Sequence, residues 1–285
     1  MSHYRSAAVC PGVAFITGGA RGLGLAIAQS FAKEGARGIV LFDIQPGDVM
    51  DNAKAAIEQY LIKGGKCLTI HGDVTKESDL ESAVAKTVSE FGRLDYAANF
   101  AGIVGPLAAT WDVNSDEFKR VIDINCTGVW LSMKVQLKQM LKQDSLGGIE
   151  EGRVEQRGAI VNCASVNSIQ GGAGTTGYTA AKHAVLGMTK SAALEARSQG
   201  IRVNCVSPGF LLTKLLDPAF KAAEGQTTAL LTGDAWGQYE ARQGRKASFD
   251  EVGDVVALLC SPRMSLVVAH NLVIDGGFTV NENPM

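Results

Sequence analysis

Two polar residues in the second half of the chain have the types and the spacing for acid–base chemistry. Tyr178 and Lys182 are four residues apart in an alanine-rich segment that favours a helix, so their side chains are expected on one face, one turn apart. A phenol ordinarily has a pKa of about 10, and a neighbouring ammonium group stabilises its ionised form. The pair therefore predicts a tyrosine that exchanges protons with a bound molecule near neutral pH.

Ser165 adds a third polar group to this pair. It directly follows the apolar run Gly158–Ala164, which is predicted to be a buried strand, and it precedes Tyr178 by 13 residues. In open parallel sheets, ligands bind beyond the carboxyl ends of the strands. The serine therefore stands where a substrate is expected to bind.

A glycine cluster lies near the start of the chain. Gly18, Gly22 and Gly24 stand between the apolar run Val13–Thr17 and a segment of helical periodicity, Gly22–Glu34. Glycines at such a turn allow the backbone to approach a pyrophosphate, and the free N–H groups of the helix N-terminus attract its charge. The next apolar run, Gly38–Asp43, ends in an acid whose carboxylate can accept both hydroxyls of a ribose. Together these features predict a dinucleotide site.

Asp43 also bears on which dinucleotide is bound. Its carboxylate would repel the 2′-phosphate of NADP, which carries about −1.5 to −2 charges, so NAD is expected. Arg21, in the glycine loop, could instead form a salt bridge with a 2′-phosphate and is the one residue that favours NADP. We predict NAD as the cofactor and keep NADP as the alternative.

The elements that must position these residues form an alternating series. Segments of helical periodicity, such as Glu77–Phe91 and Ser115–Leu141, separate short runs that are apolar on both faces, as in a parallel sheet covered by helices. The predicted fold is an α/β, Rossmann-type, doubly wound parallel sheet of about seven strands. The expected strands are Val13–Thr17, Gly38–Asp43, Lys66–His71, Leu94–Asn99, Gly158–Ala164, Ile201–Ser207 and Asn271–Asp275.

No linker or internal repeat divides the chain, so residues 1–285 are predicted to form a single domain. Two segments interrupt the alternation, a polar surface insertion at about 143–157 and a longer, apolar flap at about 210–247. The flap and the polar, glycine-rich wall at Val166–Thr176, expected to be flexible, would surround the substrate. They favour a hydrophobic secondary alcohol or ketone.

Composition excludes several other classes. A net charge of −2 and a pI of about 6.1 provide no basic field for nucleic acid or an anionic membrane. The six cysteines are far apart, which indicates reduced thiols and neither disulfides nor a metal site. The chain has no apolar stretch of about 18 residues and no signal-peptide core, so a cytoplasmic location is expected.

These motifs, in this order, resemble the classical short-chain dehydrogenase/reductase family over nearly the whole chain. The resemblance rests on the glycine motif, Asp43, Asp73-Val74, Asn99-Phe-Ala-Gly102, Asn125, Ser165, Tyr178, Lys182 and Pro208-Gly209. It implies that Tyr178 exchanges a proton with the substrate oxygen and that Lys182 holds the nicotinamide ribose and favours the tyrosine's phenolate. Ser165 would donate a hydrogen bond to the substrate oxygen. Asn125 would hold a water that links Lys182 to solvent, or else would satisfy a helix irregularity.

The resemblance also implies where the cofactor is bound. Asp73 would contact the adenine, Asn99 and Gly102 would lie along the adenosine, and the loop that begins at Pro208 would meet the nicotinamide carboxamide. The full expected cofactor set is Gly18, Arg21, Gly22, Leu23, Gly24, Asp43, Asp73, Val74, Asn99, Ala101, Gly102, Tyr178, Lys182, Pro208, Gly209, Leu211 and Thr213.

The activity implied is hydride transfer between a nicotinamide cofactor and a hydrophobic alcohol or ketone, with a softer resemblance to tailoring dehydrogenases of fungal natural-product pathways. An NADPH-dependent ketoreductase is the alternative within the fold, and a redox-inert dinucleotide-binding scaffold is the alternative from another class. The resemblance further implies a homotetramer or homodimer that pairs through helices in Asn114–Leu141 and Tyr178–Ala196.

Overall fold

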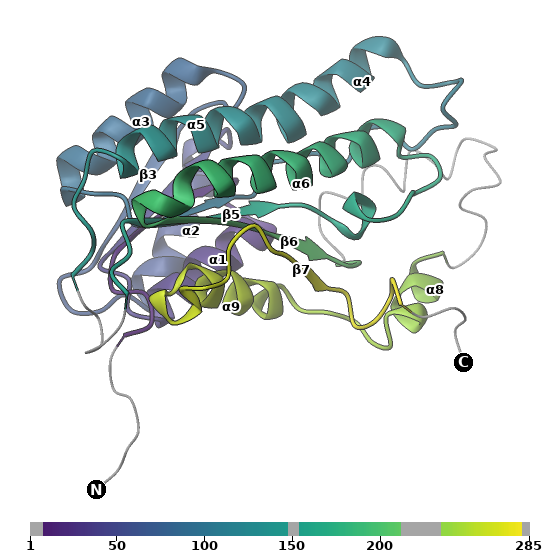
Figure 1. Ribbon diagram of the computed structural model, residues 1–285. Helices are drawn as coiled ribbons and strands as arrows, with labels where there is room; N and C mark the ends of the chain where they lie inside the picture. The colour runs from purple at the N-terminus through teal and green to yellow at the C-terminus, as the bar shows by residue number, and fades with distance from the viewer. Residues whose placement is uncertain (1–7, 148–153, 212–234, 281–285) are drawn as a thin grey trace, which may run out of the picture.

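The computed structural model describes residues 8–147, 154–211 and 235–280, and its centre is one parallel sheet (Figure 1). The sheet has seven strands in the order β3-β2-β1-β4-β5-β6-β7, which confirms the predicted fold class. The strands are β1 (Val13–Thr17), β2 (Gly38–Asp43), β3 (Lys66–His71), β4 (Tyr96–Asn99), β5 (Gly158–Cys163), β6 (Ile201–Pro208) and β7 (Asn271–Ile274). Each lies within two residues of its expected bounds.

Helices cover both faces of the sheet (Figure 1). One face carries α1 (Gly22–Lys33), α2 (Gly47–Glu58) and α9 (Phe249–Cys260), and the other carries α3 (Glu77–Phe91), α5 (Gly128–Met140) and α6 (Thr176–Ala196). Alternate residues of a strand serve the two faces. In β1, Ala14 and Ile16 pack toward α1 and α9, whereas Val13 and Phe15 belong to the core beneath α3 and α5.

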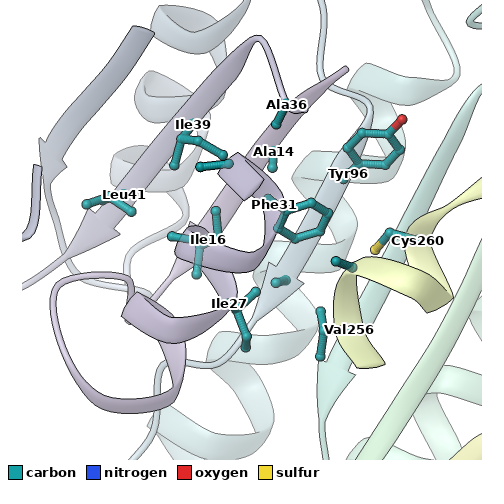
Figure 2. Packing of buried hydrophobic residues seen from close by; sticks show 14 of the residues in the cluster. Ala14, Ile16, Ile27, Phe31, Ala36, Ile39, Leu41, Tyr96, Val256 and Cys260 are labelled. Atoms are coloured by element: carbon teal, nitrogen blue, oxygen red, sulfur yellow. The ribbon is translucent and has the colours of Figure 1, made fainter. Parts of the chain in front are cut away.

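Figure 2 shows the first of these two cores at close range. Ile27 and Phe31 of α1 lie over β1 and β2, and the ring of Phe31 stacks on that of Tyr96 with centroids 5.6 Å apart. Cys260 of α9 lies near the same tyrosine. Because the strand residues here are buried on both faces, the sequence runs are apolar throughout rather than alternating.

The segment Ser115–Leu141, predicted as one helix, is interrupted. It comprises α4 (Ser115–Ile122), a π-helical turn at Asp123–Thr127 and α5. Asn114 begins it as an N-cap, since its side chain accepts hydrogen bonds from the backbone N–H groups of Asp116 and Glu117. π-Turns inside helices are frequent at functional sites, and this one contains Asn125.

The two predicted interruptions of the fold are only partly described. At the base of the insertion, the Leu146 N–H donates to the Gln156 carbonyl at 2.8 Å. The Gln156 side chain in turn accepts from the buried guanidinium of Arg202. Within the predicted flap, 212–234 lies outside the described residues, and 235–242 form helix α8 (Ala235–Arg242). No helix in the described part of the chain is long and apolar enough to cross a membrane.

A chain of buried amides connects the sheet to α5. Asn99 at the end of β4 donates to Gln136 Oε1 at 3.0 Å and to Asn162 Oδ1 at 2.9 Å, and Gln136 donates back to Asn99 Oδ1 at 2.8 Å. All three residues are at most 1% exposed. The network is self-satisfying, so removing one member leaves another buried polar atom without its partner.

Replacing Gln136 by Leu tests this network. The substitution leaves Asn99 Oδ1 without the hydrogen bond from Gln136, so the free energy of unfolding should fall by about 1–3 kcal/mol in urea titrations. Gln139→Leu, the same change at a half-buried position of α5, is the matched control and should change stability by less than about 0.5 kcal/mol. Equal effects of the two substitutions would contradict a stabilising network.

Candidate active site

The predicted site residues gather where the strand order reverses, between β1 and β4. The loops that follow these two strands are in contact, since the Thr17 hydroxyl accepts from the N–H groups of Phe100 at 3.1 Å and Ala101 at 3.2 Å. A Cβ on Gly18 would lie 2.8 Å from the Ala101 nitrogen, so only glycine allows this approach. Crevices at such reversals are where doubly wound sheets bind their ligands.

The glycine loop leaves space above the N-terminus of α1. Gly22 has φ +55°, and a Cβ placed there would meet nothing within 4 Å. A Cβ on Gly24 would instead overlap the carbonyl of Gly18, which explains why this position is a glycine. Arg21 is exposed at the N-cap of α1, whereas the Leu23 side chain packs against the core. The cradle fits a pyrophosphate held by backbone N–H groups.

Asp43 fixes the glycine loop at the end of β2. Its Oδ2 accepts from the Ala20 N–H at 3.0 Å, and its Oδ1 accepts from the Gln45 N–H at 3.2 Å. A carboxylate has about four acceptor positions, so two remain for the hydroxyls of a ribose. Asp43 is 8% exposed. With these two free acceptor positions, its carboxylate fits the adenosine half of a dinucleotide.

The other expected adenosine contacts differ in what they can offer. Asp73 Oδ1 accepts from the backbone N–H and the hydroxyl of Thr75, and Val74 is buried. The side chain of Asn99 takes part in the amide network below the site, so the backbone of this residue is the part left for the expected contact with the adenosine. Gly102 lies against Asn125, whose Oδ1 would be 2.9 Å from a Cβ at that glycine.

Asn125 is fully buried in the π-turn and holds the loop after β4. Its Oδ1 accepts from the Ile103 N–H at 2.9 Å, and its Nδ2 donates to the Ile103 carbonyl at 2.6 Å. The side chain is thus engaged with the backbone that follows the glycine at 102. A water relay through Asn125 to Lys182 stays a prediction.

Lys182 places a buried ammonium group beside Tyr178. Its Nζ donates to the Cys163 carbonyl at the end of β5 at 2.6 Å and lies 5.4 Å from the centre of the Tyr178 ring. Burial is the largest influence and alone would lower the pKa of Lys182. It is outweighed by Cys163 and Tyr178, which favour the charged form and raise the pKa above its ordinary value. The lysine is therefore a cation throughout the neutral range.

Ser165 stands at the start of a short turn next to this pair. It is the N-cap of the 3₁₀ turn Val166–Ser168, and its Oγ accepts from the Asn167 N–H at 3.2 Å. With one lone pair used in this way, the hydroxyl proton is free to be donated to a ligand. The serine is 8% exposed.

The loop after β6 forms the remaining wall of the site. Gln243 holds it, since its Oε1 accepts from the Phe210 N–H at 2.8 Å and its Nε2 donates to the Phe210 carbonyl at 3.2 Å. A Cβ on Gly209 would lie 2.9 Å from the Cα of Asp275. Pro208 and Leu211 are buried, and Thr213 lies outside the described residues.

The sequence did not indicate the polar side chains that organise the wall at 166–176. Asn167 Nδ2 donates to the hydroxyls of Thr175 at 3.1 Å and Thr179 at 3.2 Å, and Ser168 pairs with Ser207 at 2.9 Å. The expected flexible wall is thus held by hydrogen bonds at both ends. The only available signal was an amide two residues after Ser165 with threonines on either side of Tyr178.

Known proteins resemble this chain over most of its length. The family model described as Enoyl-(Acyl carrier protein) reductase matches residues 18–279. Zerumbone synthase of Zingiber zerumbet is 38% identical over 94% of both chains. (+)-Borneol dehydrogenase 2 of Salvia officinalis is 36% identical over 94% of this chain and 89% of its own.

Two solved structures share the fold and differ in their bound cofactor. Xylitol dehydrogenase bound to NAD+ has a TM-score of 0.83 at 29% identity, covering 94% of this chain and 99% of its own. A variant of actinorhodin polyketide ketoreductase with NADPH has a TM-score of 0.80 at 30% identity, covering 94% and 97%. A nicotinamide dinucleotide is therefore the cofactor class of this fold.

The raised pKa of Lys182 predicts a pH-dependent stability. The folded protein binds this proton more tightly than the unfolded chain, so the contribution of Lys182 is complete below the ordinary lysine pKa and is lost as pH rises through the raised value. The difference in unfolding free energy between the wild type and Lys182→Met should stay constant up to about pH 10 and decrease above it.

Urea titrations at a series of pH values measure this difference. Lys190→Met removes an exposed lysine from the same helix and controls for the loss of one positive charge. A difference that increases with pH would show that burial dominates and that the pKa of Lys182 is lowered.

Proposed function

Because this chain belongs to the classical short-chain dehydrogenase/reductase family, we propose that Tyr178, Lys182 and Ser165 carry its oxidoreductase chemistry on alcohols and ketones. The observation that carries the proposal is the buried ammonium of Lys182, hydrogen-bonded to the end of β5 and 5.4 Å from the Tyr178 ring. A bound nicotinamide would take a hydride from the carbinol carbon or return one to the ketone carbon.

Side chains of the site transfer the proton that accompanies this hydride. In the direction of oxidation, the Tyr178 phenolate takes the proton of the alcohol hydroxyl as the C–H bond breaks and the C=O bond forms. The Ser165 hydroxyl donates a hydrogen bond to the same oxygen and stabilises its negative charge. Lys182 stabilises the phenolate and would hold the nicotinamide ribose, and in reduction each of these steps is reversed.

The substrate we propose is a hydrophobic secondary alcohol or ketone. Zerumbone synthase and (+)-borneol dehydrogenase are similar to this chain over nearly its whole length, and the second name denotes a bicyclic secondary alcohol. The described base of the flap is aromatic. Phe210 stacks on Tyr239 with centroids 4.1 Å apart, and its ring lies tilted against that of Phe278 with centroids 4.8 Å apart. An apolar flap on this base favours a substrate without charge, such as an intermediate of natural-product metabolism.

NAD is the cofactor we propose. The two solved neighbours show that the fold accepts either nicotinamide dinucleotide, so the choice depends on the residues around the adenosine ribose. The Asp43 carboxylate accepts from the Ala20 N–H of the glycine loop, and beside a bound ribose it would repel a 2′-phosphate. An NADPH-dependent ketoreductase is the second candidate, and exposed Arg21 is its support.

Assembly and location complete the proposal. We infer a homodimer or homotetramer that pairs through α5 and α6, because Trp130 and Leu194 expose 46% and 57% of their surface on these helices. The six cysteines are all free thiols, which supports the reducing cytoplasm. Sedimentation velocity and cell fractionation test these two statements.

Tyr178→Phe tests the catalytic assignment. Removing the hydroxyl that exchanges the proton should lower kcat at least about 100-fold with a cyclic secondary alcohol such as borneol or cyclohexanol. NAD+ binding, measured by isothermal titration, should change by less than about threefold, because the ring and its contact with Lys182 remain. Unchanged turnover would refute the role of Tyr178, and absence of turnover in the wild type with every alcohol and ketone would favour the redox-inert scaffold.

Asp43→Ala tests the cofactor preference. Loss of the hydrogen bonds to the ribose hydroxyls, each worth about 1.5–3 kcal/mol, should weaken NAD+ binding at least about 10-fold. Binding of NADP+ should improve relative to NAD+. The measured quantity is the ratio of kcat/KM for NAD+ to that for NADP+, because disturbance of the glycine loop affects both cofactors alike. A wild-type ratio below one would show that the NAD assignment is wrong.

A further inference from the structure

The turn that follows Ser165 contains a residue, Asn167, that contacts the serine and that the reaction does not itself require. Asn167 is 8% exposed and lies in the 3₁₀ turn Val166–Ser168. Its backbone N–H donates to Ser165 Oγ at 3.2 Å. Its side-chain nitrogen donates to the hydroxyls of Thr175 and Thr179, which precede and follow Tyr178 in the chain. A single residue thus connects the serine to the helix that carries the tyrosine.

The orientation of the Asn167 amide follows from the protons of its partners. Thr175 donates its one hydroxyl proton to the Gly172 carbonyl at 2.7 Å, which can only accept. Toward Asn167, Thr175 must therefore be an acceptor, and the amide must present Nδ2. Thr179 then donates to Thr175, 3.0 Å away, and accepts the second Nδ2 proton. Every proton in the cluster has a partner, so the network has one arrangement.

Close packing reinforces this arrangement. A Cβ at Gly172 would lie 2.6 Å from Asn167 Nδ2 and 2.7 Å from Thr175 Oγ1. These side chains can therefore form their hydrogen bond only if position 172 is a glycine. On its other side the turn is held by Ser168, whose hydroxyl is 2.9 Å from that of Ser207. The turn cannot rotate without breaking hydrogen bonds at both ends.

We propose that Asn167 is a positioning residue that fixes the Ser165 hydroxyl relative to Tyr178. The inference deepens the proposed function and rests on it. The Asn167 N–H occupies one lone pair of Ser165 Oγ, so the serine proton is directed to the substrate oxygen. The two side-chain hydrogen bonds hold that N–H at a set distance from helix α6. A displaced serine would meet the reacting oxygen with poor geometry while the cofactor cradle stayed intact.

The first experiment is kinetic. Asn167→Leu keeps the approximate size of the side chain and removes both side-chain hydrogen bonds. It should lower kcat about 10- to 100-fold, the usual effect of a small misplacement of a reacting group. KM for the alcohol should change by less than about threefold, and so should the Kd of NAD+.

The decisive readout is the dependence on Ser165. If Asn167 acts through the serine, then Asn167→Leu in a Ser165→Ala background should lower kcat by less than about twofold further. If Asn167 has only a structural role, the two losses should multiply. An equal loss in both backgrounds, or an unchanged kcat for Asn167→Leu alone, would overturn the proposal.

A matched control and a second variant complete the design. Asn204 is a buried amide in β6 that donates to the Val267 carbonyl and accepts from the His270 N–H. Asn204→Leu should lower stability and leave kcat unchanged.

If Asn167→Leu does not fold, the double variant Thr175→Val, Thr179→Val removes the same hydrogen bonds from the other side and should show the same dependence on Ser165. A wild type without alcohol or ketone turnover would instead refute the proposed function itself, an outcome that these variants do not mimic.

Discussion

The geometry of the site depends on one buried charge. Lys182 is 3% exposed, and an ammonium group in such a position is costly unless polar groups surround it. The Cys163 carbonyl at the end of β5 and the Tyr178 side chain supply those groups. Because the Lys182 ammonium must reach that carbonyl, α6 is held against the carboxyl end of β5. The same contact therefore holds α6, the helix of Tyr178, beside the turn that begins at Ser165, two residues after β5.

Two different constraints explain why positions around the site are glycines. In the first loop they let backbone meet backbone, as at Gly18 against Ala101, and leave open space at Gly22. In the wall at 166–176, Gly172 is small because Asn167 and Thr175 occupy the place of its side chain. In the proposed function, the first kind of glycine would make room for the cofactor, and the second makes room for the side chains that hold the turn after Ser165. The sequence has 33 glycines among its 285 residues, and this count alone does not separate the two kinds.

The sequence predicted the strands well, for a physical reason. Each central strand is buried on both faces, so it appears as an uninterrupted apolar run, and the residue that ends the run lies at the ligand-binding edge. Asp43 was found in this way. The same burial hides the direction of a side chain, because a strand that is apolar on both faces has no polar alternation to mark which face a residue serves. The sequence did not show, for example, that the side chain of Asn99 joins Gln136 and Asn162 beneath the site; a place for this residue along the adenosine stays a prediction. A helix irregularity at Asn125 was kept only as the alternative to a water relay, and the π-turn at Asp123–Thr127 is such an irregularity. Apolar spacing did not locate it, since a continuous helix and an interrupted one share the same spacing over so few residues.

Directional hydrogen bonds hold the turn after Ser165 in one arrangement. Apolar contacts are not directional and tolerate small rotations, whereas a network in which each proton has one acceptor defines one arrangement. The cost is that every member must be present, because a buried donor without its acceptor is destabilising. The network includes residues from the serine turn, the wall and α6, and through Ser168 and Ser207 it reaches the end of β6 beside the loop expected to meet the nicotinamide. A single set of directional contacts therefore holds the turn after Ser165, helix α6 and the end of β6 in fixed positions relative to one another. The first two carry the groups that would move the proton, and the third precedes the loop expected to meet the nicotinamide.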